Sequence, residues 1–94
     1  MFTYIEFFRL TPLAREHLEK TPEWFEKIHE IVEQEGGTVD RFLAIMGPWE
    51  YLAIVKYPDN EAAFRVLGKI AKLPYFETET FPAEDVELFV KVFV

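Results

Sequence analysis

Two histidines, His17 and His29, are the first candidates in this sequence for proton transfer near neutral pH. Imidazole titrates close to neutral pH and is also a common metal ligand. Neither histidine belongs to a His-x-x-x-His or comparable metal-binding spacing, and catalysis would require both to converge with a carboxylate. A structural or surface role is therefore the favoured interpretation, and catalysis is the alternative.

Glu6 and Asp40 are further acid–base candidates because each lies within a predicted strand. A carboxyl group on a strand could reach a cavity between a sheet and its covering helices. Burial there would raise its pKa and suit it to act as a general base. The alternative is a cross-strand ion pair with Arg9 or Arg41, which is the commoner arrangement in sheets and is favoured for each residue.

Trp49 and Glu50 form the strongest pair of candidate binding residues, because an aromatic wall beside a carboxylate could hold a small amphipathic ligand. Trp24, on a long predicted helix, is a third candidate, since a cavity is expected between that helix and the sheet. The structural alternative, which is favoured, has Trp49 anchoring a hairpin in an interface and Glu50 accepting backbone or arginine hydrogen bonds. No Gly-rich phosphate loop, nucleophile elbow or metal-ligand cluster occurs, so we predict no cofactor and no metal site.

Composition limits the classes of protein to which the chain can belong. Its 94 residues suit one domain over 1–94, and half are apolar, enough for a real core. The net charge of −7 argues against nucleic-acid binding. No signal peptide and no apolar run of about 18 residues is present, so we predict a cytoplasmic protein that does not bind membranes. One Asn, one Gln, no Cys and abundant Glu are typical of a thermophile.

The elements that must position these residues follow from hydrophobic periodicity and stop signals. Thr11-Pro12 and Thr21-Pro22 both predict a helix start, and Gly36-Gly37 predicts a helix end. The tail, 82–94, fits either a helix or a strand. The order β-α-β-β-α-β predicts an α+β, ferredoxin-like fold with a four-stranded antiparallel sheet. Strands are expected at 2–10, 38–46, 49–57 (after a tight turn at Gly47-Pro48) and 75–81, and helices at 12–20, 21–35 and 60–72.

Both faces of the predicted strands are apolar, although this topology places both helices on one side of the sheet. Ile5 and Phe7 oppose Tyr4 and Phe8, and in the second strand Val39 is expected on the same face as Leu43. A second copy packed face to face would cover the remaining apolar surface, so we predict a homodimer or higher homo-oligomer. The alternative is a monomer whose C-terminal tail folds across the open face.

Four segments of the chain stand out by their order and spacing: GGTV at 36–39, GPWE at 47–50, PDNEAA at 58–63 and ETET at 77–80. Together they resemble the GYD-domain family of small proteins, within the dimeric α/β-barrel superfamily. The segment at 47–50 stands where that family has G-x-Y-D, with Trp49 for its Tyr and Glu50 for its Asp. The resemblance implies a dimeric α/β barrel and no settled activity.

A second resemblance, at 47–54 and 73–80, is to the amino-acid-sensing domain of leucine-responsive transcription regulators. The first helix and Gly36-Gly37 fit the GYD pattern better. We therefore expect a homo-oligomeric module that binds a small molecule. The alternatives are a cofactor-free oxygenase- or dehydratase-like enzyme of the dimeric α/β-barrel type, and a stand-alone amino-acid sensor.

Overall fold

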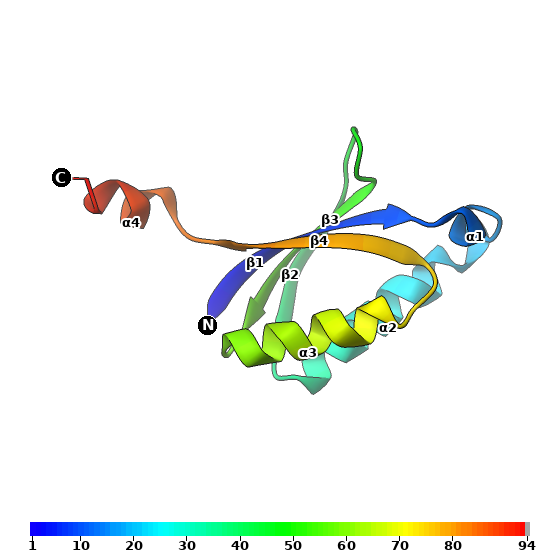
Figure 1. Cartoon of the computed structure of the whole chain (residues 1–94), viewed down its shortest axis with the longest axis horizontal. Helices are drawn as coiled ribbons and strands as arrows, with labels where there is room; N and C mark the ends of the chain where they lie inside the picture. Colours follow the sequence, from blue (N-terminus) through cyan, green and yellow to red (C-terminus); the bar gives the residue numbers. More distant parts are fainter. Residues whose placement is uncertain (94) are drawn as a thin grey trace.

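The computed structural model describes residues 1–93 and contains one four-stranded antiparallel sheet in the order β2-β3-β1-β4. The chain order confirms the predicted α+β, ferredoxin-like arrangement, with α2 and α3 on one side of the sheet (Figure 1). The strands are β1 (Phe2–Leu10), β2 (Thr38–Ala44), β3 (Tyr51–Tyr57) and β4 (Phe76–Ala83). The helices are α1 (Pro12–Arg15), the short 3-10 helix η1 (Leu18–Lys20), α2 (Thr21–Gln34), α3 (Asn60–Ala71) and α4 (Val86–Lys91).

Local signals explain where the helices begin and end. The Thr11 hydroxyl accepts a hydrogen bond from the Ala14 amide at 3.2 Å, and Asp59 caps α3 by accepting from the Ala62 amide at 2.7 Å. Gly36 follows α2 with a φ of 78°, the left-handed conformation that a C-terminal glycine allows. The first helical region was predicted as two helices, at 12–20 and 21–35, but it forms three pieces. The first of these predicted helices is divided into α1 and η1, and α2 begins at Thr21.

The core lies between the sheet and the helices α2 and α3. Successive residues of β1 alternate between buried and half-buried, so one face of the sheet is covered and the other is open. Aromatic rings link the layers, for example Phe25 of α2 against Phe42 of β2, with ring centres 5.1 Å apart. Fully buried side chains from the sheet include Phe8, Val55 and Tyr57.

Three local details differ from the sequence-based expectation. A β-bulge between Val39 and Arg41 shifts the alternation of β2, so Val39 pairs with Val55 on the helix-covered face instead of sharing the face of Leu43. The β2–β3 connection spans 45–50, so it is a wide loop rather than a tight turn. In α3, helical spacing predicts a buried face that includes Phe64, but Ala62 is buried and Phe64 is 73% exposed.

The open face of the sheet is apolar, as predicted. Ile5 of β1 pairs with Ile54 of β3 and with Phe81 of β4, and Phe7 pairs with Leu52. In β1 and β3, the residues that alternate with them along the strands point toward the helices and are mostly buried. These side chains therefore point away from the helices and are partly exposed to solvent. No helix covers this face in the described part of the chain (Figure 1).

The C-terminal segment, for which a helix and a strand were both considered, is a strand in its first part and a helix in its second. β4 continues to Ala83, and α4 follows it as a short helix. The helix lies away from the rest of the protein, at the far end of β4 (Figure 1), so the tail does not fold back over the sheet as the monomeric alternative requires. The apolar residues of 86–93 are between 49% and 77% exposed.

Candidate functional site

The best-defined pocket lies between α3 and the β1–β4 side of the sheet. Its volume is about 280 Å³, which is large enough for a small organic ring. Most of the lining is apolar. The lining residues are Tyr4, Thr80 and Pro82 from the sheet and Asn60, Ala63, Phe64 and Leu67 from α3.

Glu6 does not line this pocket itself, but its strand neighbours Tyr4 and Thr80 do. It is 1% exposed and is the one buried charged residue among the described residues. Its position on β1 is fixed by register: Tyr4 lies two residues earlier on the same face, and Thr80 is its direct partner on β4. The Tyr57 hydroxyl donates a hydrogen bond of 2.5 Å to Glu6 Oε1. The carboxyl group is thus held from one side by a phenol on the neighbouring strand.

Two buried polar atoms in the described residues have no hydrogen-bond partner, Glu6 Oε2 and Thr80 Oγ1. They belong to residues that face each other across β1 and β4. An unpartnered buried polar atom costs about 1 to 3 kcal/mol, so two of them side by side call for an explanation. Thr80 also lines the pocket, which places this unsatisfied hydrogen-bonding capacity at the pocket wall.

Burial raises the pKa of the Glu6 carboxyl group above its ordinary value, and the hydrogen bond from Tyr57 opposes this only partly. The pKa of Tyr57 is also raised, first by burial and then by the neighbouring Glu6. Tyr57 therefore stays a hydrogen-bond donor throughout the physiological range. Glu6 is poised to exchange a proton at a higher pH than an exposed glutamate.

The other acid–base candidates lie on the surface. The side chain of His17 is 48% exposed and lies 3.6 Å from Glu19, and His29 is 47% exposed and lies 2.6 Å from Glu33. Asp40 sits in the bulge of β2 and forms a cross-strand ion pair at 3.4 Å, but its partner is Lys56 rather than Arg9 or Arg41. The structure does not bring these residues together with Glu6.

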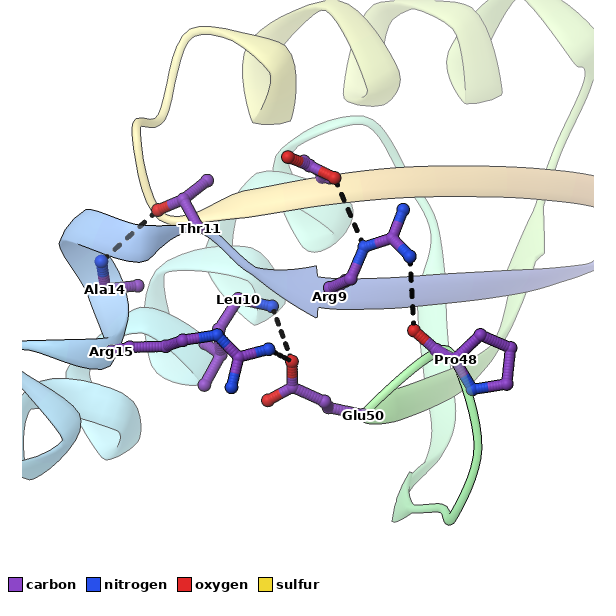
Figure 2. A network of polar contacts seen from close by, with 8 residues as sticks. Arg9, Leu10, Thr11, Ala14, Arg15, Pro48 and Glu50 are labelled. Atoms are coloured by element: carbon purple, nitrogen blue, oxygen red, sulfur yellow. Dashed lines mark hydrogen bonds and ion pairs between the residues drawn. The ribbon is translucent and has the colours of Figure 1, made fainter.

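Trp49 and Glu50 are neighbours in sequence but contact different parts of the protein. The Trp49 ring packs against Phe7 on the open face, with centres 6.0 Å apart, and the Arg9 guanidinium stands 4.6 Å from its centre. Glu50 instead accepts hydrogen bonds from the Leu10 amide and from Arg15 (Figure 2). The contacts of Glu50 are of the backbone and arginine kind expected for it, and the role of Trp49 in an interface stays a prediction.

Figure 2 also shows how the wide loop is fastened to β1. Arg9 donates a hydrogen bond of 3.3 Å to the Pro48 carbonyl, and on its other side it binds Glu77 of β4 at 3.2 Å. Together with Glu50, this contact places the loop beside the end of β1. Backbone and arginine contacts therefore already engage the Pro48 carbonyl and one oxygen of Glu50.

Trp24 is buried in the core and stacks on Tyr75 with ring centres 4.5 Å apart, so it lies apart from Trp49 and Glu50. A hollow of about 460 Å³ does occur between α2 and β2, where the sequence predicted a cavity. It is broad, open to solvent and rimmed by glutamates, and Trp24 does not line it. Its lining residues are Phe25, Glu26, His29, Glu30, Glu33 and Phe42.

Sequence reasoning identified Glu6 but missed the residues around it. Tyr4 lines the pocket and donates a hydrogen bond to Asn60 Oδ1, which ties β1 to the start of α3. The alternation of β1 placed Tyr4 and Glu6 on one face. The strand order then decides which residue of β4 faces Glu6, and that order could not be taken from the alternation of a single strand.

Within residues 1–93, no group of three or more His, Asp or Glu side chains is arranged to hold a metal ion. In the same range, every helix is too short or too polar to cross a lipid bilayer.

Solved structures with a similar fold share little sequence with this chain. FFRP-DM1 aligns with a TM-score of 0.62 at 20% identity, covering 89% of this chain and 100% of that one. TTHA0845 from Thermus thermophilus aligns at 0.59 and 22%, covering 90% and 95%. An AsnC family transcriptional regulator from Agrobacterium tumefaciens aligns at 0.57 and 24%, covering 89% of this chain and 50% of the regulator.

The comparison with protein families is more specific than the structural likeness. No curated protein matches the chain. The model of the GYD domain matches residues 4–92, which contain the pocket, the wide loop and α4. That match spans nearly all of the 94 residues and agrees with the resemblance of the four segments. The chain therefore belongs to the GYD domain family.

Proposed function

We propose that this protein is a homo-oligomeric module that binds a small molecule in the pocket between α3 and the β1–β4 side of the sheet. Membership of the GYD domain family, and a fold shared with an AsnC family transcriptional regulator, are compatible with a small ligand-sensing module. The proposal does not depend on that likeness, because fold alone does not determine function.

The observation that supports the site is the position of the unpartnered polar atoms. Glu6 Oε2 and Thr80 Oγ1 are buried without partners in the described residues, and Thr80 lines an apolar pocket. Ligand pockets commonly combine an apolar lining with a few convergent polar groups. A ligand bound there would supply hydrogen bonds that the protein alone leaves unmade.

The homo-oligomeric part of the proposal is supported by the open face. Ile5, Phe7 and Ile54 form an apolar sheet surface, and α4 carries exposed apolar side chains away from it. Contiguous apolar patches of this kind mark interaction sites on proteins. A second copy would cover the sheet face, and the pocket on the opposite side would remain available to a ligand.

The site is tested with a metabolite library and two matched variants. Leu67→Trp fills the pocket from α3, and Ala71→Trp places the same side chain on an exposed position one turn further along. Compounds that raise the melting temperature of the wild type should still do so in Ala71→Trp and should fail in Leu67→Trp. Equal responses in both variants would place binding elsewhere.

A cofactor-free enzyme is a second candidate, and one observation favours it. Burial raises the pKa of Glu6, whose strand partner Thr80 lines the pocket, and a carboxylate of raised pKa is suited to take a proton from a substrate. Glu6 would take one proton from a quinol, and dioxygen would accept the two electrons and both protons, giving the quinone and hydrogen peroxide. Oxygen consumption with a quinol that disappears in Glu6→Gln would support the enzyme, and binding without turnover would support the sensor.

A further inference from the structure

We propose that the pocket selects small, mainly apolar molecules that carry one hydrogen-bond-donating head group, such as a hydroxyl or an ammonium, and rejects molecules whose head group is a free carboxylate. This inference rests on the proposed binding site and names the class of ligand that the site takes. It also separates the protein from an amino-acid sensor, whose ligands carry a carboxylate.

The two buried polar atoms without partners beside the pocket are both oxygens that can accept a hydrogen bond. Tyr57 already donates its proton to Glu6 Oε1, and Tyr4 donates its proton to Asn60. Glu6 Oε2 and Thr80 Oγ1 are left without partners among the described residues. A carboxylate oxygen accepts hydrogen bonds, and a threonine hydroxyl can both accept and donate. A ligand whose head group donates a hydrogen bond would therefore match these two oxygens.

The charges near the pocket disfavour an anionic ligand. None of the described residues that line it is Lys or Arg, so a carboxylate would be buried without a positive partner. It would also approach Glu6, which is negative when ionised, in a protein whose net charge is −7. A hydroxyl or an ammonium avoids both penalties.

The rest of the pocket sets the size and polarity of the body of the ligand. Ala63, Phe64 and Leu67 of α3 face Pro82 of β4 and offer apolar surface. A volume of about 280 Å³ suits a body with a single ring. Phe64 is exposed at the rim, so a ligand would cover apolar surface that water now contacts.

The test compares four probes that share one ring: toluene, benzyl alcohol, benzylamine and benzoate. Dissociation constants are measured at pH 7 by two-dimensional NMR titration, following the amides of Ala63 and Thr80. We expect benzyl alcohol or benzylamine to bind at least tenfold more tightly than benzoate. Glu6→Gln should weaken benzylamine at least tenfold and leave toluene unchanged. Thr80→Val is the second variant, because it removes the other unpartnered oxygen while Glu6 remains.

The outcomes separate the two proposals. If toluene binds but neither donor head group improves on it, or if benzoate binds as tightly as benzylamine, the ligand class is wrong while the pocket stands. Donor probes whose affinity is unchanged in both variants would likewise overturn the inference. If no probe shifts the amides of Ala63 and Thr80, both the ligand class and the binding site are wrong.

Discussion

A carboxyl group in the core of a small protein is costly, and Glu6 has one of its two oxygens unpartnered. Replacing buried charged groups by apolar ones of similar volume is often neutral or stabilising, so folding alone does not require a glutamate there. Tyr57 lessens the cost through one hydrogen bond but leaves Oε2 unsatisfied. A ligand in the adjoining pocket, as proposed above, would account for both the residue and its missing partner.

The raised pKa of Glu6 predicts how stability depends on pH. Because the folded state holds this proton more tightly than the unfolded state, stability is greatest below the unfolded pKa, near 4.5, and falls as the pH rises through the folded pKa. Each pKa unit by which the folded value exceeds the unfolded one costs about 1.4 kcal/mol at higher pH. The hydrogen-bonded neighbour of Glu6 is Tyr57, whose raised pKa keeps its phenol neutral in this range. From α3, the buried residues Ala63 and Val66 carry no titratable group.

Glu6→Gln removes this titration while keeping the acceptor for Tyr57. Urea denaturation of both proteins between pH 4 and pH 8 should therefore show the variant gaining stability relative to the wild type as the pH rises. The difference should level off above the folded pKa. A constant difference across the whole range would contradict a raised pKa at Glu6.

Trp49 gives a second prediction at the scale of the residue. Its contacts in one copy are an aromatic pair with Phe7 and a cation–π contact with Arg9. Such contacts contribute about 0.5 to 1.5 and about 0.5 to 1 kcal/mol, so Trp49→Ala should lower the free energy of unfolding by about 1 to 2 kcal/mol and weaken self-association. Trp49→Tyr, the residue of the G-x-Y-D motif, should cost little. Chemical denaturation and sedimentation measure the two effects, and equal, negligible changes would show that Trp49 has neither role.

At the scale of elements, most of the fold could be predicted because its signals are local. The caps Thr11 and Asp59 and the glycines after α2 each act over a few residues, and the structure places helix boundaries at all of them. The bulge at Asp40 could not be predicted, because it depends on how β2 pairs with β3. The pocket could not be predicted for the same reason, because the order of the strands in the sheet is what brings β1, β4 and α3 together.

Two glycines test this view of the elements with the same substitution. Gly37 lies in the connection between α2 and β2. A Cβ at this position would lie 2.8 Å from side-chain atoms of Val32 and Tyr57 and 3.0 Å from the Lys56 carbonyl oxygen. Gly68, in the middle of α3, has nothing within 4 Å of that position. Gly37→Ala should destabilise the fold by about 1 to 3 kcal/mol, as overpacking does. Gly68→Ala should stabilise it by about 0.5 to 1 kcal/mol through helix propensity.

Thermal and chemical denaturation of the two glycine variants side by side provide the measurement. Each variant serves as the control for the other, since the added methyl group is identical. If Gly37→Ala stabilised the fold, the turn between α2 and β2 would have room for a methyl group, which would contradict the predicted clash. A destabilising effect at Gly68 would mean that α3 depends on a glycine there for another reason.

At the scale of the whole molecule, the described chain is too extended for a compact unit of its length. Its principal extents are 51 × 30 × 18 Å and its radius of gyration is 14.2 Å, whereas a compact chain of this size has a radius of gyration near 12 Å, by a rough estimate. The excess comes from the segment after β4, which projects with α4 at its end (Figure 1). An extended arm with exposed apolar side chains, together with an open apolar sheet face, is what a protomer separated from its partner would show.

Adjacent residues of β3 separate folding from association. Val55 faces the helices and is fully buried, whereas Ile54 faces the open side and is half-buried. Val55→Asp buries an unpaired charge, which costs several kcal/mol, and should unfold the chain. Ile54→Asp places the same charge on the predicted interface and should leave the circular dichroism spectrum unchanged. Sedimentation velocity at micromolar concentration should then find an oligomer for the wild type and a folded monomer for Ile54→Asp. A monomeric wild type, or an Ile54→Asp variant that still associates, would remove the sheet face as the interface.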